Sequence, residues 1–384
     1  MALSKIDIEN MVTGATPVAN GGTGQTTLAA AGLQRPNTKS IVVNGDMAVA
    51  QRSTSLASIS ASGYYTVDRY KFSDDSDAVL TFTQESLTSG NAYLDGFANA
   101  FKIDVTTVDS SLGADQHALL STAIEGQDLQ TLKKGTANAE TITIAFWVKA
   151  TKTGTSIFEI YDNDNTRQVS KAFTISTTNT WEKKVLNFPA DTTGALDDDN
   201  AVSLYFQWYL CAGANYQSGT LSETWTSPTT ANRAVGQVNH FDNTSNNFHL
   251  TGFQIEVGTF SSTTLPPFQH ESYGDNFARC ARYFYRVAQH GADGLSNQTV
   301  GTGYYKNTDQ FRVSVYLPVT PRTNPSLVSG SASNAYVIDI QGATDYVDDF
   351  TLTRSNAKII QVMHNNSDAS GTIGEAGEIA TDNS

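Results

Sequence analysis

The stretch Val202-Ser-Leu-Tyr-Phe-Gln-Trp-Tyr-Leu210 decides the fold class, because large apolar side chains occupy every second position. Successive side chains of a β-strand point to opposite faces, so a period of two marks a strand with one face in a core. The apolar face would carry Val202, Leu204, Phe206, Trp208 and Leu210, and the opposite face Ser203, Tyr205, Gln207 and Tyr209. We therefore predict a strand whose outer face is polar and rich in tyrosine.

The same alternation recurs in Ile142-Thr-Ile-Ala-Phe-Trp-Val148, which predicts a second strand. Turn clusters rich in Asp and Asn, such as Asp162-Asn-Asp-Asn165, separate segments of this kind. Further strands are predicted at Val79–Gln84, Phe101–Thr106, Ile157–Tyr161, Glu182–Phe188 and Phe248–Val257. Many short strands without helices between them predict an antiparallel β-sandwich over residues 39–272.

The composition narrows the class of protein. The chain has 384 residues and a net charge of −14, with 16% charged and 10% aromatic residues. Few charges and many aromatics favour an all-β protein over a disordered chain. The acidic surface repels nucleic acid and anionic membranes, and no apolar run of about 18 residues occurs, so we expect neither nucleic-acid binding nor membrane insertion. Cys211 and Cys280 lie far apart in a chain without a signal-peptide pattern, which favours synthesis in a reducing host cytoplasm.

A helix and a second group of strands follow the sandwich. Phe277, Cys280, Ala281 and Phe284 have helical spacing within Tyr273–Tyr285, and Asp275 is the expected N-cap. Strands are then predicted at Thr299–Tyr305, Phe311–Leu317, Ala335–Ile340, Phe350–Arg354 and Lys358–Met363. We expect a connecting helix over 273–290 and a small C-terminal β domain over 291–384, with a loose tail from Ser367.

The first 38 residues differ from the rest. Residues 17–36 read PVANGGTGQTTLAAAGLQRP, with small residues, glycine clusters and almost no large apolar side chain. Such a segment cannot bury enough surface to fold alone. We expect residues 1–38 to serve as an extended tether, or to become ordered on a partner.

Several segments resemble the jelly-roll modules of bacteriophage tail fibres. The most specific combination is Phe253–Gly258, Pro267–Gly274 and Cys280–Phe284. Weaker matches lie at Asn44–Arg52, Tyr64–Tyr70, Ile124–Gln130, Ala145–Lys149, Thr180–Lys184 and Val319–Pro325, and Val18–Thr27 is similar to repeats near fibre attachment regions. The resemblance implies a homotrimeric virion fibre that attaches to phage tail proteins through residues 1–38 and contacts the host surface with its β domains. It implies no catalytic site.

The sandwich also resembles the carbohydrate-binding modules of bacterial glycosidases. Sugar C–H faces stack on aromatic rings, and sugar hydroxyls need fixed hydrogen-bond partners. Tyr205, Gln207 and Tyr209 have the chemistry for a shallow glycan site, although this face also suits packing on a neighbouring subunit or plain exposure. Tyr216 and Trp225, in a loop-like stretch, are candidates for ligand contact or for packing. Trp147 and Trp181 are expected in the core or at a sheet edge.

Metal binding and catalysis have weaker support. Modules of this shape often hold a calcium ion near the first and last strands, and Asp46 could supply one oxygen. The last strand reads Leu250-Thr-Gly-Phe253, without an acidic ligand, so we expect no metal and no cofactor. No Ser/His/Asp constellation stands out, and nothing singles out a carboxylate pair among 38 acidic residues. We therefore expect a non-enzymatic protein.

These observations predict a bacteriophage tail fibre, a virion structural protein that recognises a host surface glycan. Two alternatives remain open. One is an architectural component of the virion, such as a head decoration or a tail adaptor, without receptor binding. The other is a polysaccharide depolymerase tailspike. Tailspikes of that type usually carry long β-helix repeats, and the sequence shows no such period, which counts against this alternative.

Overall fold

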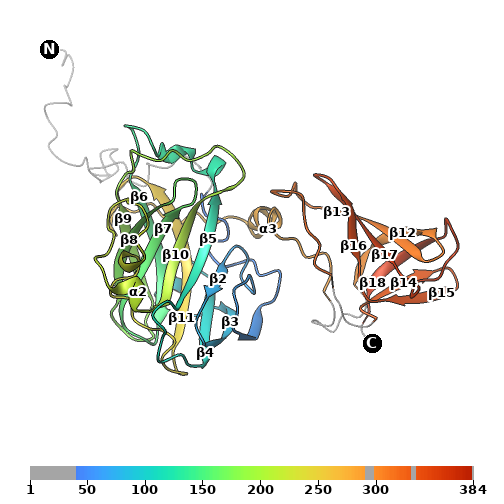
Figure 1. Cartoon of the computed structure of the whole chain (residues 1–384), viewed down its shortest axis with the longest axis horizontal. Helices are drawn as coiled ribbons and strands as arrows, with labels where there is room; N and C mark the ends of the chain where they lie inside the picture. The colour runs from blue at the N-terminus through green and yellow to red at the C-terminus, as the bar shows by residue number, and fades with distance from the viewer. Residues whose placement is uncertain (1–39, 290–297, 330–333, 383–384) are drawn as a thin grey trace, which may run out of the picture. The chain divides into compact units, whose positions relative to one another are not determined.

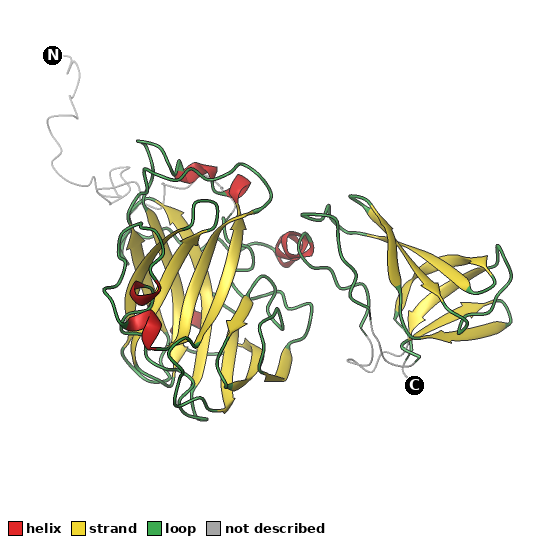
Figure 2. Cartoon of the chain, in the orientation of Figure 1, coloured by secondary structure: helices red, strands yellow, loops and turns green. Residues whose placement is uncertain are grey.

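The computed structural model describes residues 40–289, 298–329 and 334–382. The chain divides into two compact units, Met1–Glu271 and Ser272–Ser384 (Figure 1). The predicted tether over residues 1–38 lies outside the described residues, and so does the end of the predicted connecting segment at 290. Strands are the main regular structure of both units, and the helices are short (Figure 2). The predicted all-β class is therefore confirmed.

The first unit is a sandwich of two antiparallel sheets. The six-stranded sheet has the order β1 (Ser55–Ile59), β3 (Val79–Ser86), β4 (Asn99–Thr107), β11 (Asn247–Val257), β6 (Ile142–Ala150), β9 (Glu182–Phe188). The five-stranded sheet has the order β2 (Lys71–Asp74), β5 (His117–Glu125), β10 (Val202–Ala212), β7 (Gly154–Asp162), β8 (Arg167–Ile175). Most strands that follow one another along the chain lie in different sheets, which is the connectivity of a jelly roll.

The core between the two sheets is aromatic, as the alternation predicted. Leu204, Phe206 and Trp208 of β10 are completely buried. The Trp208 indole lies 4.9 Å from the Phe158 ring and 4.8 Å from the Phe253 ring, centroid to centroid, with nearly perpendicular planes. Edge-to-face contacts of this kind add to the hydrophobic gain from burial. The apolar face of the deciding strand thus ties β7 to β11 on the opposite sheet.

Short helical turns lie at the ends of the strands. They are α1 (Asn91–Leu94), η3 (Gly126–Asp128), η4 (Gln130–Leu132), α2 (Ala214–Gln217) and η5 (Thr230–Asn232). Residues 213–237, which include α2 and η5, form a cover over one end of the five-stranded sheet. Within this cover Leu221 and Ala234 pack with Leu119, Ile157 and Tyr209 on the outer face of that sheet. That end of the outer face is therefore not a free surface.

The predicted helix is present as α3 (Tyr273–Ala281), but its N-cap is Ser272 and not Asp275. The Ser272 hydroxyl accepts a hydrogen bond from the Asp275 N–H at 3.2 Å and donates one to Asp275 Oδ2 at 2.7 Å. A serine with an acidic residue three positions later satisfies the free N–H groups at a helix start. The helix ends before the predicted Tyr285, and the Arg282 carbonyl accepts a hydrogen bond from the Arg322 N–H at 2.9 Å.

The second unit contains one seven-stranded antiparallel sheet. Its order is β15 (Ala343–Val347), β14 (Tyr336–Ile340), β18 (Ala376–Thr381), β12 (Thr299–Asn307), β13 (Gln310–Tyr316), β17 (Ile359–Asn365), β16 (Thr351–Ser355). Tyr305, Phe311 and Ile338 lie in its core. The prediction of a loose tail is wrong for residues 376–381, because β18 lies between β14 and β12 and buries Ile379. A β-carbon at Gly377 would lie 2.7 Å from the Asp339 carbonyl oxygen, so glycine permits this close pairing.

Candidate functional site

The outer face of the five-stranded sheet carries polar and aromatic side chains in two adjacent cross-strand rows. Tyr205 of β10 is in register with Tyr161 of β7. One row away, Gln207 of β10 lies between Glu159 of β7 and Ser121 of β5. Residues in register on antiparallel strands share a face, with β-carbons about 4.5–5.5 Å apart. We call this surface the tyrosine face, and its members are Lys71, Ser121, Glu159, Tyr161, Tyr205, Gln207 and Arg233.

Arg233, from the end of η5, holds Glu159 on this face. Its Nε donates to Glu159 Oε2 at 3.0 Å, its Nη2 donates to Oε1, and its guanidinium lies 5.5 Å from the centroid of the Tyr161 ring. Burial disfavours the guanidinium charge, but the hydrogen bonds and the charge of Glu159 outweigh burial and raise the pKa of Arg233. The Glu159 side chain is completely hidden, whereas that of Arg233 keeps 20% exposure. On this face the guanidinium of Arg233 is therefore accessible to solvent, whereas the carboxylate of Glu159 is not.

Gln207 has an unused hydrogen-bond acceptor. Its side chain is half-buried, and Oε1 is shielded from solvent without accepting a hydrogen bond from any described residue. A shielded polar atom without a partner costs about 1–3 kcal/mol. A ligand hydroxyl or a water molecule donating to Oε1 would remove that cost. Gln207 therefore has an acceptor that an external donor would satisfy.

Tyr209 was expected on a solvent-facing surface, but it does not face solvent. It lies on the outer side of β10 but is completely buried, because the cover of residues 213–237 packs over it. Burial raises the pKa of its phenol well above the usual value. Tyr216 of α2 is half-exposed, with ring centroids 6.4 Å from Tyr209 and 4.5 Å from His117. Tyr209 thus packs beneath the cover, and Tyr216 is a part of the cover that contacts it.

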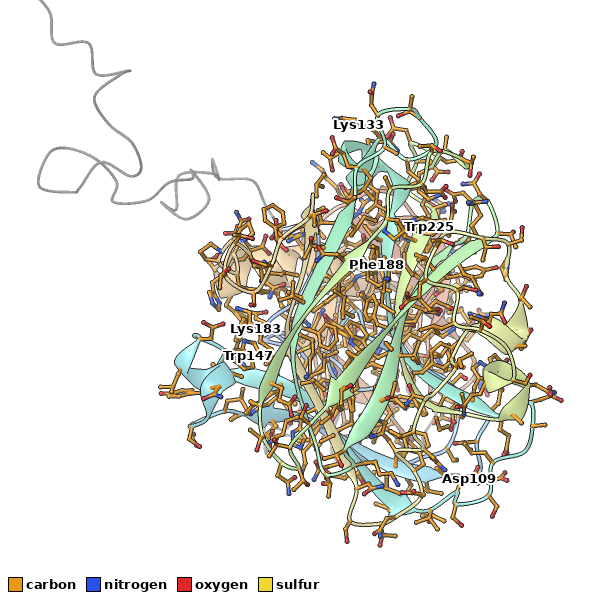
Figure 3. The ribbon with its side chains drawn as sticks, turned by 90° about the vertical axis from the view of Figure 1, so that its left-hand side faces the viewer. Asp109, Lys133, Trp147, Lys183, Phe188 and Trp225 are labelled. Carbon is orange, nitrogen blue, oxygen red and sulfur yellow. The ribbon has the colours of Figure 1, made fainter. Side chains whose placement is uncertain are left out.

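Trp225, within residues 213–237, packs against the main core and not with the cluster around Tyr209. Its indole N–H donates to the Pro189 carbonyl at 2.9 Å, and Lys134 Nζ lies 4.8 Å from the ring centroid. Figure 3 shows Trp225 close to Phe188 and well away from Trp147. The glycan role proposed for Trp225 from sequence remains a prediction, since its visible contacts are all within the protein.

A buried charge network stands next to Tyr161. Asp162 is completely buried and pairs with Lys134, which also lies 3.0 Å from Asp191 Oδ2. Arg167 Nε donates to the same Asp191 at 2.8 Å. Burial raises the pKa of Asp191, but hydrogen bonds from Arg167 and Lys134 outweigh burial and lower it. Because these ion pairs join three separate loops, they fix the end of β7 and hence the position of Tyr161.

The outer face of the six-stranded sheet has its polar groups paired with one another. Trp147 Nε1 donates to Asp95 Oδ2 at 3.1 Å, and Lys183 Nζ donates to the same oxygen at 2.9 Å (Figure 3). Trp181 is buried against Leu87 and neighbouring residues of the α1 region. Both tryptophans therefore serve packing, as the sequence analysis expected for core or sheet-edge residues.

The described part of the chain holds no cluster of three or more His, Cys, Asp or Glu side chains that could bind a metal ion. Asp46 Oδ1 accepts a long hydrogen bond from the Ala48 N–H at 3.4 Å. The neighbouring Asn44 crosslinks the segment, because its Nδ2 donates to the Val49 and Asp68 carbonyls at 2.9 Å. Among residues 40–289, 298–329 and 334–382 no helix is long and apolar enough to span a membrane.

Both cysteines are buried, and neither forms a disulfide bond. Cys211 lies in the main core at the end of β10, and Cys280 lies on the buried side of α3. Burial raises the pKa of the Cys211 thiol far above its usual value. Neither thiol can supply a nucleophile to the tyrosine face.

Tyr205 and Gln207 were predicted from the sequence, whereas Tyr161, Glu159 and Arg233 were not. A signal for Tyr161 and Glu159 was present, because they alternate with Phe158 and Ile160 within the predicted strand Ile157–Tyr161. Arg233 had no such signal in the sequence, because its ion pair joins residues 74 positions apart. A loop arginine gains its place only when the cover folds onto the sheet.

No family model matches the chain, and no curated protein matches it. Among solved structures it is similar to the enzymatically active domain of tailspike protein 4 of bacteriophage CBA120, with 13% identity, a TM-score of 0.30 and coverage of 57% of this chain and 21% of the other. A family 11 carbohydrate-binding module from Clostridium thermocellum, in complex with a mixed-linked tetrasaccharide, has 11% identity, a TM-score of 0.27 and coverage of 52% and 97%. A protein described as a sugar-binding protein of Bacteroides thetaiotaomicron has 15% identity, a TM-score of 0.28 and coverage of 57% and 100%.

Proposed function

We propose that the protein is a bacteriophage fibre component that binds a host surface glycan through the tyrosine face. The observation that carries this proposal is the registered pair Tyr205–Tyr161, adjacent to Gln207 with its unused acceptor. Aromatic rings side by side on a rigid sheet offer stacking surfaces for sugar rings, and a neighbouring amide fixes a sugar hydroxyl. The sheet holds these groups in place before a ligand arrives, which limits the ordering cost of binding.

The chemistry of this face is recognition without bond cleavage. Glycoside hydrolysis requires two carboxyl groups placed across the scissile bond. Glu159, the carboxylate on the tyrosine face, is hidden and held by both arms of the Arg233 fork. A carboxylate engaged in this way is not available as a nucleophile or as a proton donor. We therefore infer a binding role for this face and not a hydrolytic one.

The place in the virion rests on the resemblance of the sequence to phage tail fibres. In this proposal residues 1–38 attach the chain to tail proteins, and a homotrimer presents three copies of the tyrosine face. Individual sugar contacts are weak, and linked sites increase avidity without new contacts. The second unit, Ser272–Ser384, would extend toward the host as a further contact domain.

The test is glycan binding by the full chain on an array of bacterial surface polysaccharides, followed by titration calorimetry. Tyr161→Ala and Tyr205→Ala should each weaken binding by about tenfold, as expected when one stacking contact worth about 1 kcal/mol or slightly more is lost. Tyr93→Ala removes an exposed tyrosine of α1 and is the matched control, which should bind as the unmodified chain does. Absence of any bound glycan, or equal losses in all three variants, would exclude the tyrosine face.

A further inference from the structure

The two ends of the Gln207 row carry cationic side chains. At one end Lys71 of β2 is in register with Ser121, which is in register with Gln207. The next residue, Phe72, points into the core, so Lys71 points to the outer face. Lys71 is half-exposed, and its ammonium group makes no ion pair or hydrogen bond with any residue in the described ranges. It is a cation without a charge partner in the described ranges, and it lies in the same cross-strand row as Gln207.

The opposite end of the row is cationic at its surface as well. Arg233 lies over the completely hidden Glu159, so the exposed part of this ion pair is the guanidinium. A third cation, Arg69, is buried: its Nη2 donates to the carbonyl of Ala123, the residue in register with Tyr205 on the side away from Tyr161, and its charge acts on Asp68. Cations therefore stand on both sides of Tyr205 and Gln207.

Two carboxylates at this face are withdrawn from solvent. Glu159 is covered by Arg233, and Glu125, further along β5, is buried and accepts a hydrogen bond from Gln127 Nε2 at 2.6 Å. The arrangement is the reverse of the chain as a whole, which has a net charge of −14. Charges farther away than about 10 Å are largely screened at 0.1 M salt, so a ligand on the face responds mainly to the local cations.

We propose that the tyrosine face selects an anionic glycan, whose sugar ring carries a carboxylate or a phosphate group placed between Lys71 and Arg233. This inference rests on the proposed function, because it names the class of glycan bound at the same face. The sugar ring stacks on Tyr161 and Tyr205, and a hydroxyl donates to Gln207 Oε1. The anionic group provides the charge partner that Lys71 lacks within the protein. A neutral glycan would leave the Lys71 charge without a counterpart.

The experiment uses the full chain and an array of bacterial polysaccharides, each printed in native, carboxyl-reduced and phosphatase-treated form. Loss of binding after carboxyl reduction identifies a uronic acid, and loss after phosphatase treatment identifies a phosphate monoester. Lys71→Gln should weaken binding of the native glycan by about fivefold to tenfold, the scale of one ion pair at a partly buried site. Lys102→Gln, which removes a lysine paired with Asp104 on the other sheet, is the matched control and should have no effect.

Each result separates this inference from the proposed function. If native and charge-depleted glycans bind equally, or Lys71→Gln and Lys102→Gln behave alike, the face binds glycans but does not select anionic ones, and the inference is overturned. If no glycan in any form is bound, both the inference and the proposed function are wrong. The inference is supported by binding of the anionic form that Lys71→Gln weakens, with an unchanged melting temperature showing that the variant is folded.

Discussion

Arg233 grips the hidden carboxylate of Glu159 with two hydrogen bonds, although the two residues are 74 positions apart in the sequence. This ion pair joins the cover of residues 213–237 to β7. It is therefore both the support of the cover and the cationic border of the tyrosine face.

Arg233→Met should destabilise the first unit by about 3–5 kcal/mol, because it leaves the Glu159 charge buried without a partner. The double variant Arg233→Met/Glu159→Leu should recover most of that loss, since a buried ion pair can be replaced by apolar side chains at little cost. Urea unfolding followed by tryptophan fluorescence measures both values. Equal stabilities of the single and double variants would contradict a buried, charged Glu159.

His240 should make the first unit less stable in acid. Its imidazole is completely buried beside Ser156, and burial, with a smaller contribution from Lys152, lowers its pKa to about 4. The unfolded chain has a histidine pKa of about 6.5, so it binds an extra proton between these values. The contribution of neutral His240 to the free energy of unfolding is present in full above pH 6.5. It is lost as the pH falls toward 4, and the free energy of unfolding then decreases by about 3 kcal/mol.

The check compares urea unfolding at pH 7 and pH 4.5 for the unmodified chain and for His240→Gln. The variant removes the titrating ring, so its stability should fall less between the two pH values. Other groups titrate equally in both proteins and cancel in the comparison. Parallel pH profiles for the two proteins would show that His240 is not responsible.

Gly252→Ala should strongly destabilise the sandwich. Gly252 has φ of +62°, and an added β-carbon would lie 2.7 Å from the Phe97 ring. Left-handed backbone alone costs a residue other than glycine about 1–2 kcal/mol, and overpacking adds about 1–3 kcal/mol. Gly236→Ala, at φ of +91° with its nearest neighbour at 3.6 Å, carries the strain without the clash. Thermal unfolding should show a larger drop for Gly252→Ala, and equal drops would disprove the contact with Phe97.

Trp225→Ala should lower stability and leave glycan affinity unchanged in the folded protein. The indole contacts Lys134 and Pro189 and packs on the core, so its loss removes internal contacts. Calorimetric titration corrected for the folded fraction, beside a melting curve, separates the two effects. A selective loss of affinity at unchanged stability would instead support the ligand contact considered from sequence.

Several strands with one covered face were readable from sequence, because burial on one side imposes alternation, whereas β1, β2 and β8 were not predicted. β9 was predicted at its observed bounds, Glu182–Phe188, and β10 differs only by two residues at its end. β5 (His117–Glu125) was not predicted, since the cover and the core bury both of its faces and remove the alternation. β18 escaped for another reason: Ile379 is its only large apolar residue, and pairing on both edges defines the strand.

The candidate site was half readable. Tyr205 and Gln207 follow from the period of β10, which also placed Tyr209 on the outer side of the strand. Whether an outward residue is exposed depends on what folds over it, and the cover arises from residues 213–237 through contacts that no local pattern encodes. Tyr209 is buried for that reason, and Arg233 joins the site by the same folding event.

The two sulfhydryl groups are sealed inside the folded chain, one in each unit, and the whole sequence contains no others. When the protein leaves a reducing cell interior, oxygen therefore finds no exposed thiol to oxidise. Neighbouring copies of the folded chain are then not linked by disulfide bonds. No disulfide bond holds copies of the folded chain together, so the behaviour of any assembly in detergent should not depend on an added reductant.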